Sequence, residues 1–199
     1  MSRTGIFSRR DVARSLKIIK KNLVLITANQ AYAQRVLSRS KITTPVGDLF
    51  LIANDSVLLA AGFSSYSNLH KRLDAADALL QFKEVKSIPK VSELISDYFD
   101  GDFSAINAIE VRQPGTSFYQ SIWRQMRKIP AGKTWTYSEL AKRAGNAEAV
   151  RAAGTACGAN LIAPIIPCHR ITKTGGAIGN YGYGVKIKEW LLRHEGALN

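Results

Sequence analysis

The feature that most constrains the fold is a pair of short helix patterns that meet at a glycine within residues 135–159. Thr136 and Glu139 have the spacing of a capping box, in which the threonine hydroxyl accepts from the glutamate amide and the glutamate reaches back to the threonine amide. Gly145 can end this helix in the left-handed conformation, and Asn146 can cap the next helix. Two short helices across a glycine turn predict a helix-turn-helix unit.

The second helix of this unit has one long cation, Arg151, on an exposed side that is otherwise made of small residues. These are Ala147, Ala152, Thr155, Ala156 and Ala159. A helix that reads base edges in the major groove needs long polar side chains, whereas small residues let a helix backbone approach the narrow minor groove. The pattern predicts minor-groove docking, with Arg151 occupying the space of an extruded base. The alternative is an ordinary phosphate-contacting or surface arginine.

The charge distribution also separates the chain into regions. The 199 residues carry a formal net charge of +13, to which residues 1–47 contribute +9, residues 48–114 contribute −4 and residues 115–199 contribute +8. A basic C-terminal region after a mildly acidic middle favours one domain that meets a polyanion and one that does not. A solvated basic surface is the alternative that charge alone leaves open.

The middle of the chain has the pattern of a small α/β unit. Apolar runs at residues 49–53 and 57–63 are separated by Asn54-Asp55-Ser56, which predicts a β-hairpin. Apolar residues then recur at helical spacing over residues 69–80 and over residues 91–98. Ordered patterning therefore starts near residue 42.

These patterns predict an α+β protein in three parts. Residues 1–41 form a basic N-terminal extension, residues 42–113 a small α/β domain, and residues 114–199 a mainly helical domain, with the connection at Gly101–Gly115. No apolar run approaches the length of a membrane span, so we expect a soluble protein. The two cysteines, Cys157 and Cys168, do not have the spacings of a disulfide framework, which favours a reducing compartment such as the cytoplasm.

The candidate for chemistry is Pro167-Cys168-His169-Arg170. The apolar residues before it predict a buried extended segment with Cys168 at its end. His169 can act as base to Cys168 directly or through one water, and a carboxylate such as Glu195 can fix the imidazole tautomer and stabilise its charged form. Without such neighbours, a buried free cysteine is usually inert packing.

With these residues in view, the chain from about Ser117 to Gly196 is similar to the O6-alkylguanine-DNA alkyltransferase family, and its hairpin-bearing middle resembles the small N-terminal domain of that family. The shared pieces are Phe118–Trp123, Ile129-Pro130, Tyr137, Arg151–Gly154, Asn160, Pro167–Arg170, Gly179–Tyr181 and Leu191–Gly196. The resemblance implies a ribonuclease H-like α/β domain followed by a winged helix-turn-helix domain that carries the active-site cysteine.

The resemblance also implies the activity. It is DNA repair by direct reversal, in which Cys168 irreversibly takes the alkyl group from O6-alkylguanine, and also from O4-alkylthymine, once per protein molecule. The partner is double-stranded DNA, bound in the minor groove with little sequence preference by a monomer. Neither a cofactor nor a catalytic metal is required. In a bacterial cell such a protein is expected with the nucleoid.

Site residues follow from the resemblance residue by residue. His169, through a water and with Glu195 behind it, promotes thiolate formation, while Tyr137 hydrogen-bonds the flipped guanine. Arg151 replaces the base in the stack, and the neighbouring DNA contacts are Ala152, Gly154 and Thr155. The substrate pocket is expected to consist of Asn160, Tyr181, Gly182, Tyr183, Cys157 and Ile171.

Three departures from the family pattern give further expectations. Leu161 follows Asn160 where many relatives have proline, which affects the approach to the cysteine. Tyr183 stands where some relatives have glycine, which predicts a narrower pocket that accepts methyl better than benzyl groups. Some relatives bind zinc through N-terminal cysteines and histidines, but this chain has no cysteine before Cys157 and only His70 upstream, so no zinc is expected.

Three other functions are less consistent with these residues. A lesion-binding relative that does not react would lack the cysteine. A winged-helix regulator of transcription would carry longer base-reading side chains on its recognition helix. A cysteine hydrolase would need an oxyanion site, and a histidine directly after the nucleophile is an uncommon way to build its catalytic pair.

Overall fold

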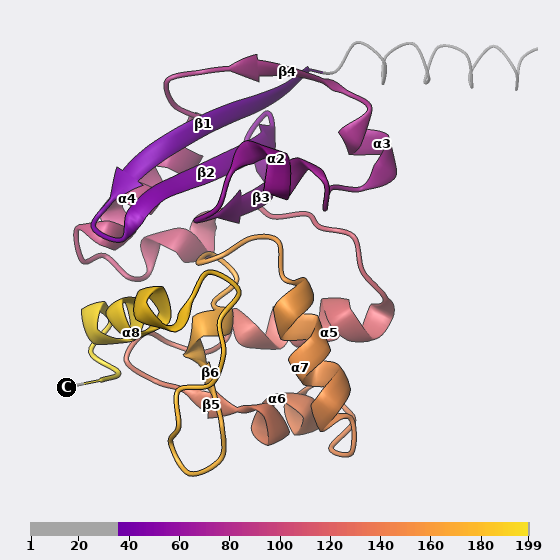
Figure 1. Ribbon diagram of the computed structural model, residues 1–199, viewed down its shortest axis with the longest axis vertical. Coiled ribbons are helices and arrows are strands. Elements are labelled where there is room, and N and C mark those ends of the chain that lie inside the picture. Colours follow the sequence, from indigo (N-terminus) through magenta and orange to yellow (C-terminus); the bar gives the residue numbers. More distant parts are fainter. Residues whose placement is uncertain (1–35, 199) are drawn as a thin grey trace, which may run out of the picture. The chain divides into compact units, whose positions relative to one another are not determined.

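A four-stranded sheet occupies the first part of the described chain, residues 36–198 of this computed structural model (Figure 1). Its strands lie in the order β3-β2-β1-β4, and β2 pairs antiparallel with both β1 and β3. The bounds are Val36–Thr44 for β1, Gly47–Asn54 for β2, Val57–Gly62 for β3 and Gln81–Glu84 for β4. The predicted hairpin is confirmed as β2 and β3, and the positive φ of 51° at Asp55 makes its tight turn.

Strand β1 shows that order begins earlier than predicted, at Val36 rather than near residue 42. Leu37 is fully buried, and Ser38 pairs with Ala53 of β2. The inward-facing position at Ser40 is polar, and its hydroxyl donates to the Lys86 carbonyl at 3.0 Å. That serine breaks the apolar alternation by which a strand is detected. The predicted N-terminal extension therefore includes the start of the first strand, and its residues 1–35 lie outside the described residues.

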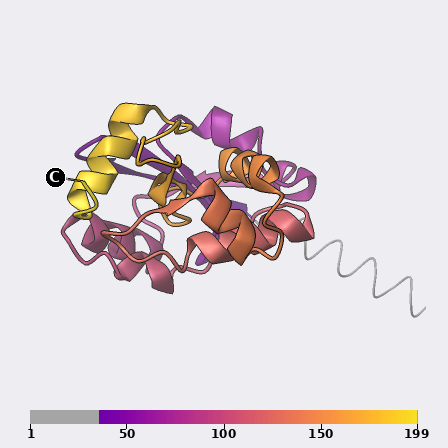
Figure 2. The same cartoon turned by 90° about the horizontal axis from the view of Figure 1, so that it is seen from below.

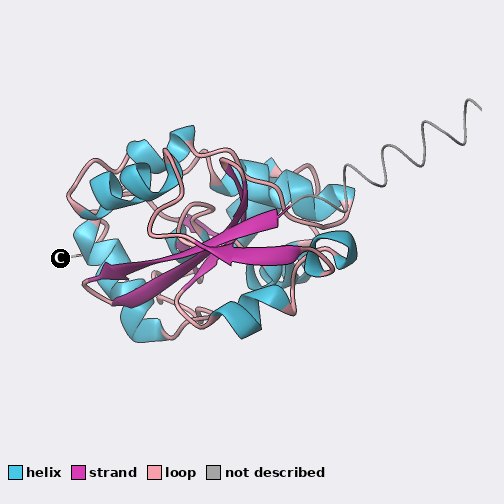
Figure 3. Ribbon diagram, turned by 90° about the horizontal axis from the view of Figure 1, so that it is seen from above, coloured by secondary structure: helices cyan, strands magenta, loops and turns pink. Residues whose placement is uncertain are grey.

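Short helices complete this part of the chain, which we call the sheet segment (residues 36–111). Helix α4 confirms the helix predicted over residues 91–98. The pattern over residues 69–80 belongs to two helices instead of one, because Asp74 caps a new helix by accepting from the Ala76 amide at 3.0 Å. The bounds are Tyr66–His70 for α2, Ala75–Ala78 for α3, Val91–Phe99 for α4 and Ala105–Ala108 for the 3₁₀ helix η1. Seen from above, helices lie to either side of the strands (Figure 3).

The remainder, the helical segment (residues 117–198), places α5, α6 and α7 on one side and α8 on the other, with two short parallel strands between them (Figures 1 and 2). The bounds are Ser117–Met126 for α5, Trp135–Thr136 for β5, Tyr137–Arg143 for α6, Val150–Ala159 for α7, Cys168–Arg170 for the 3₁₀ helix η2, Ile171–Thr172 for β6 and Val185–His194 for α8. A mixed α+β fold was predicted, and it is confirmed.

Helices α6 and α7 pack together as the predicted helix-turn-helix pair. The capping box of Thr136 and Glu139 is present, and Gly145 has the left-handed φ of +97°. The prediction that Asn146 caps the second helix is wrong: α7 starts later, at Val150. Asn146 instead accepts from the Glu148 amide at 3.1 Å and so stabilises the turn before the helix.

The sheet segment and the helical segment belong to one compact unit that runs from Leu37 onward. The outer edge of β3 joins them, because the Ala61 amide donates to the Leu161 carbonyl at 2.9 Å and the Ala163 amide donates to the Ala61 carbonyl at 3.0 Å. This pairing anchors the stretch that leads to Cys168. Within residues 36–198, no helix is long and apolar enough to cross a membrane.

Candidate active site

Cys168 lies at a cavity of about 270 Å³ between α6, α7 and the loop before α8. The predicted site residues that line this cavity are Tyr137, Gly154, Cys157, Cys168, Tyr181 and Gly182. Gly158 and Asn180 line it as well, although neither was predicted as a pocket residue. Residues separated by up to 45 positions in the sequence (137 to 182) therefore meet around one sulfur atom.

The prediction that Cys168 lies at the end of an extended segment is wrong, because Cys168 begins the 3₁₀ helix η2. The chain turns sharply just before it, where the Ile166 amide donates to the Ile162 carbonyl at 2.7 Å. The Asn160 side chain holds the new position, since its Nδ2 donates to the Ile166 carbonyl at 2.7 Å and to Sγ of Cys168 at 3.2 Å.

The thiol of Cys168 is not ionised by its surroundings alone. Burial raises its pKa, while the hydrogen bond from Asn160 and the positive charge of Lys188 act in the opposite direction. Burial also raises the pKa of the second cysteine, Cys157, far above its ordinary value. A reaction at Cys168 near neutral pH therefore needs a base.

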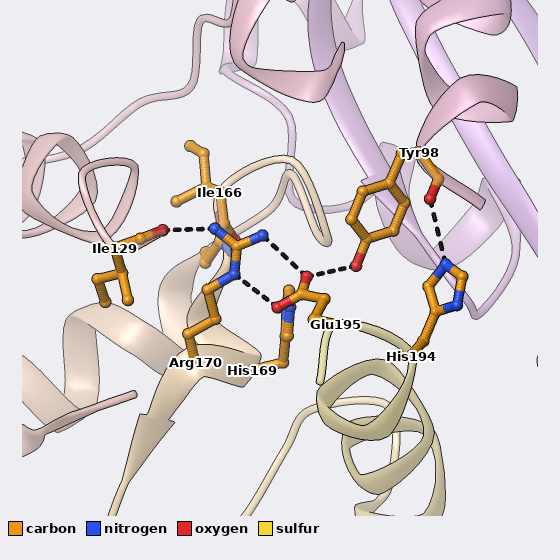
Figure 4. A network of polar contacts seen from close by, with 8 residues as sticks. Tyr98, Ile129, Ile166, His169, Arg170, His194 and Glu195 are labelled. Carbon is orange, nitrogen blue, oxygen red and sulfur yellow. Dashed lines mark hydrogen bonds and ion pairs between the residues drawn. The ribbon is translucent and has the colours of Figure 1, made fainter. Parts of the chain in front are cut away.

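The base is available in His169, which is fully buried next to Glu195 (Figure 4). His169 Nε2 lies 2.9 Å from Oε1 of Glu195, whereas its Nδ1 has no hydrogen-bond partner in the described part of the chain. Burial lowers the pKa of His169, against the opposing effect of Glu195. A neutral imidazole that donates from Nε2 keeps the lone pair of Nδ1 available to accept a proton.

Glu195 is held as a carboxylate by several donors. Arg170 donates from Nε to Oε2 and from Nη2 to Oε1, both at 2.8 Å (Figure 4). Burial alone would raise the pKa of Glu195, but His169 and Arg170 hold it well below its ordinary value. Arg170 belongs to the family pattern, but no role is predicted for it from the sequence. Its position as a charged residue inside an apolar stretch is a signal for a buried ion pair.

Lys188 is a second buried cation, and it is not predicted from the sequence. Its Nζ donates to the backbone carbonyls of Ile178, at 2.6 Å, and of Ile171 and Asn180. Burial lowers its pKa to about 8. The lysine thus ties the loop that carries Asn180 and Tyr181 to the strand after the cysteine. Its helical spacing alone gave no indication that it faces inward.

Leu161, which stands where many relatives have proline, takes part in the turn before Cys168 through its backbone amide. Its amide, which proline would lack, donates to Oε1 of Gln113 at 2.7 Å, and Gln113 Nε2 donates to Oδ1 of Asn160 at 3.3 Å. The Ile162 amide also donates to Asn160 Oδ1, at 3.1 Å. The turn that presents the cysteine is therefore held by an amide network instead of a proline ring.

Three predicted pocket residues, Asn160, Ile171 and Tyr183, do not line the cavity. Tyr183 turns toward β3, where its ring packs edge-on against Phe63 and its hydroxyl donates to the Ala61 carbonyl at 3.4 Å. It also packs edge-on against Tyr181, which does line the cavity. Ile171 is fully buried in β6 and pairs with β5. Asn160, also predicted for the pocket, contacts the Cys168 sulfur from beneath the surface.

Helix α7 connects this cavity with an exposed surface. Gly154 and Gly158 line the cavity, while Arg151, Ala152 and Thr155 are exposed one turn away. The small-residue side was predicted to include Ala156, but this residue is fully buried and its carbonyl accepts from Nε1 of Trp123 at 2.9 Å. The exposed face of α7 is consequently narrower than predicted, with Arg151 as its long cation.

Comparison with known sequences connects this geometry to a family. Residues 117–197 match the family model described as 6-O-methylguanine DNA methyltransferase, DNA binding domain. A methylated-DNA–protein-cysteine methyltransferase of Salmonella typhimurium is 34% identical over 170 residues, which cover 81% of this chain and 97% of that protein. The protein of the same description from Methanosarcina acetivorans is 33% identical over 154 residues, with 77% and 95% covered.

Solved structures agree with the sequence matches. The crystal structure of the O6-methylguanine methyltransferase of Mycobacterium tuberculosis aligns with a TM-score of 0.67 and 30% identity, over 81% of this chain and 93% of that one. A structure of a Mycobacterium tuberculosis protein of this kind in complex with DNA aligns with a TM-score of 0.67 and 29% identity, over 80% and 93%.

Proposed function

The chain belongs to the 6-O-methylguanine DNA methyltransferase family, and from this premise we propose that Cys168 is the residue that accepts the methyl group. The function of the chain is DNA repair by transfer of a methyl group from methylated DNA to a cysteine of the protein itself. The single observation that supports Cys168 is its position at a cavity, with the next residue, His169, buried and paired with Glu195 at 2.9 Å.

The substrate we propose is O6-alkylguanine, extruded from the duplex into the cavity. Nδ1 of His169 accepts the thiol proton of Cys168, directly or through one water, and Glu195 stabilises the imidazolium that forms. The sulfur attacks the alkyl carbon, a C–S bond forms, and the bond from that carbon to O6 breaks. Guanine leaves with the electron pair of that bond on its oxygen.

Tyr137 is the proposed donor to the leaving guanine. It lines the cavity, and burial raises the pKa of its hydroxyl, with the two cysteine sulfurs adding to this effect. The hydroxyl therefore stays protonated near neutral pH and can donate as negative charge develops on the purine. No metal or cofactor takes part in these steps, because the electrophilic carbon is already present in the lesion.

The reaction we propose ends with a thioether on Cys168 that nothing in the site can reverse. Breaking a thioether requires a nucleophile and a leaving-group acid, and the proton that His169 gained leaves with guanine or with solvent. Each protein molecule therefore acts once. The same chemistry would serve O4-alkylthymine, since it too carries an alkyl carbon on a ring oxygen.

We further propose how DNA is bound. The exposed face of α7, with Arg151 and its small neighbours, fits the minor groove of a duplex with little sequence preference. The cavity opens on the same helix, so a nucleotide extruded there would reach Cys168. The protein would act as a monomer in the cytoplasm, associated with the nucleoid in a bacterial cell. In the finer fold assignment, residues 42–113 form the ribonuclease H-like domain and residues 114–199 the winged helix-turn-helix domain.

The alternatives, a lesion-binding protein that does not react or a winged-helix DNA-binding regulator, are not favoured. The proposal is tested by incubating the protein with a duplex that contains one O6-methylguanine and measuring the guanine restored. We expect restoration up to one lesion per protein molecule. Turnover beyond one lesion per protein, or tight binding of the duplex with no restoration, would contradict it.

A further inference from the structure

We propose that Tyr98, which lies on α4 in the sheet segment, is a positioning residue for the reaction at Cys168. Its hydroxyl fixes the carboxylate of Glu195 and so sets the basicity of His169. The inference rests on the proposed function, and it assigns the sheet segment a direct part in the chemistry of the helical segment.

Tyr98 and His169 both contact the same oxygen atom, Oε1 of Glu195. The Tyr98 hydroxyl donates to Oε1 of Glu195 at 2.6 Å, and the same oxygen is the one that lies 2.9 Å from Nε2 of His169 (Figure 4). Tyr98 is fully buried, and burial together with the Glu195 charge raises the pKa of its hydroxyl well above the ordinary value. The tyrosine can therefore only donate to Glu195 at physiological pH.

The position of the Tyr98 ring is itself fixed by packing. Three rings meet it edge-on, those of Phe99, Phe103 and His194, with centroid distances of 5.1, 6.0 and 5.8 Å. Nε2 of His194 also lies 3.1 Å from the Tyr98 carbonyl oxygen (Figure 4). Helix α4 thus contacts the end of α8 through His194 as well as through the Tyr98–Glu195 hydrogen bond, which leaves the hydroxyl little freedom to move.

The consequence for His169 follows from how charge is shared. A carboxylate oxygen that accepts from several donors offers less negative charge to each of them, and Oε1 accepts from Tyr98 and Arg170 besides His169. Without the Tyr98 hydroxyl, Glu195 would stabilise the imidazolium more strongly. His169 would then bind a proton at higher pH and would be less available as a base.

The other ionisable groups around His169 do not replace this contact. Arg170 and Lys188 are cations that disfavour the imidazolium, and both are held by buried carbonyl or carboxylate oxygens. Cys168 is the proton donor itself. The Tyr181 ring meets the imidazole edge-on at 6.4 Å, and its hydroxyl makes no hydrogen bond within the described residues. Tyr98 is the neutral donor that shares Oε1 with His169.

The test compares Tyr98→Phe with a matched control, Tyr66→Phe, in the full chain. Both substitutions remove only a phenolic hydroxyl from the sheet segment, and the Tyr66 hydroxyl is buried without a partner in the described chain. The rate of methyl transfer in a single turnover is measured against pH, and the pKa of His169 is measured by NMR of labelled imidazole. These readouts would not shift if Tyr98 only packed the core.

We expect Tyr98→Phe to raise the pKa of His169 by about half a unit, which moves the acid limb of the rate profile to higher pH and slows transfer about threefold on that limb. Tyr66→Phe should leave both unchanged. Replacing tyrosines by 3-fluorotyrosine makes the hydroxyl a stronger donor without altering the fold, and it should shift the limb to lower pH in the wild type but not in Tyr98→Phe.

If the acid limb of the rate profile has the same midpoint pH in Tyr98→Phe as in the unaltered protein, with or without a uniformly lower rate, the inference is overturned. If Tyr98→Phe does not fold, the pKa of His169 measured by NMR in the fluorotyrosine protein decides, because Tyr98 is the tyrosine that donates to Glu195, and an unshifted pKa there has the same meaning. Failure of the proposed function looks different, because the unaltered protein would then transfer no methyl group, while the NMR comparison would still test the Tyr98–Glu195–His169 link.

Discussion

Nε2 of His169 lies 2.9 Å from Oε1 of Glu195, and both side chains are completely buried. A buried carboxylate so close to an imidazole fixes the tautomer and leaves Nδ1 as the atom that can accept a proton. Because burial lowers the pKa of His169, the imidazole is neutral before it acts. The proposed chemistry at Cys168 depends on this pair.

Glu195→Gln should slow methyl transfer about 10²-fold or more, because an amide can neither stabilise the imidazolium nor hold the tautomer as firmly. It also leaves Arg170 buried without its carboxylate, which costs about 3–5 kcal/mol of folding stability. Single-turnover kinetics and chemical unfolding measure the two effects. Glu189→Gln serves as the control, because Glu189 lies on α8, the helix that Glu195 follows, and this substitution should leave the transfer rate unchanged.

Folding stability should fall as the pH drops below about 6.5, the ordinary pKa of histidine. The folded pKa of His169 is depressed, so the unfolded chain binds its proton first and stability is lost as the pH falls through this window. Glu195, also depressed when folded, adds a second loss below about pH 4.3, where the unfolded carboxylate is protonated. Unfolding measured from pH 8 to pH 4 shows the slope. In His169→Gln the upper part of this slope should be reduced, and an undiminished slope would contradict the assignment.

Asn160→Ala should slow the reaction of Cys168, because it removes the N–H that donates to Sγ and so raises the pKa of the thiol further. The alkylation rate of Cys168 by iodoacetamide, followed against pH, measures this directly. The variant also leaves the Ile162 amide and Gln113 without their acceptor, so folding is checked in parallel. A thiol that titrates at the wild-type pH in a folded variant would show that Asn160 serves the turn alone.

Arg151→Ala should slow repair in duplex DNA more than in single-stranded DNA, because only a duplex has a stack in which the guanidinium can replace the extruded base. Arg151 is exposed on α7, the helix whose Gly154 and Gly158 line the cavity, so its removal should not disturb the fold. Lys83→Ala, which removes an exposed cation on β4, controls for the loss of charge. Equal slowing in both kinds of DNA would assign Arg151 to phosphate contact.

Tyr183 should limit the size of the alkyl group, so that O6-methylguanine reacts faster than O6-benzylguanine in the same DNA. The effect is indirect, because Tyr183 does not line the cavity but packs edge-on against Tyr181, which does. Tyr183→Gly should free Tyr181 and raise the benzyl rate relative to the methyl rate. Equal rates of the two substrates with the unaltered protein would refute the expectation.

The sequence was most informative where structure is decided locally. The capping box at Thr136, the left-handed Gly145 and the β2–β3 hairpin depend on neighbouring residues, and all three were predicted. The family pattern also pointed to most of the residues around the cavity. Proline, glycine and cysteine in fixed order are strong signals because few other residues can take their places.

What was missed depends on contacts between distant residues. The helical pattern over residues 91–98 predicts only an apolar position at Tyr98, and no pattern predicts a role for Lys188, because neither spacing nor residue type shows that a side chain contacts Glu195 or three carbonyls. Tyr183 was placed at the cavity because its neighbours in sequence are there, yet its ring turns to β3. The start of β1 was missed because Ser40, a polar residue, faces inward.

The central claim is that Cys168 takes the methyl group, and the most direct test is the intact mass of the protein after incubation with a duplex that carries one O6-methylguanine. Peptide mapping should place a single added methylene on Cys168, with none on Cys157, and Cys168→Ala should bind the DNA but gain no mass. A methylene on Cys157, or no added mass while the lesion is restored, would contradict the account.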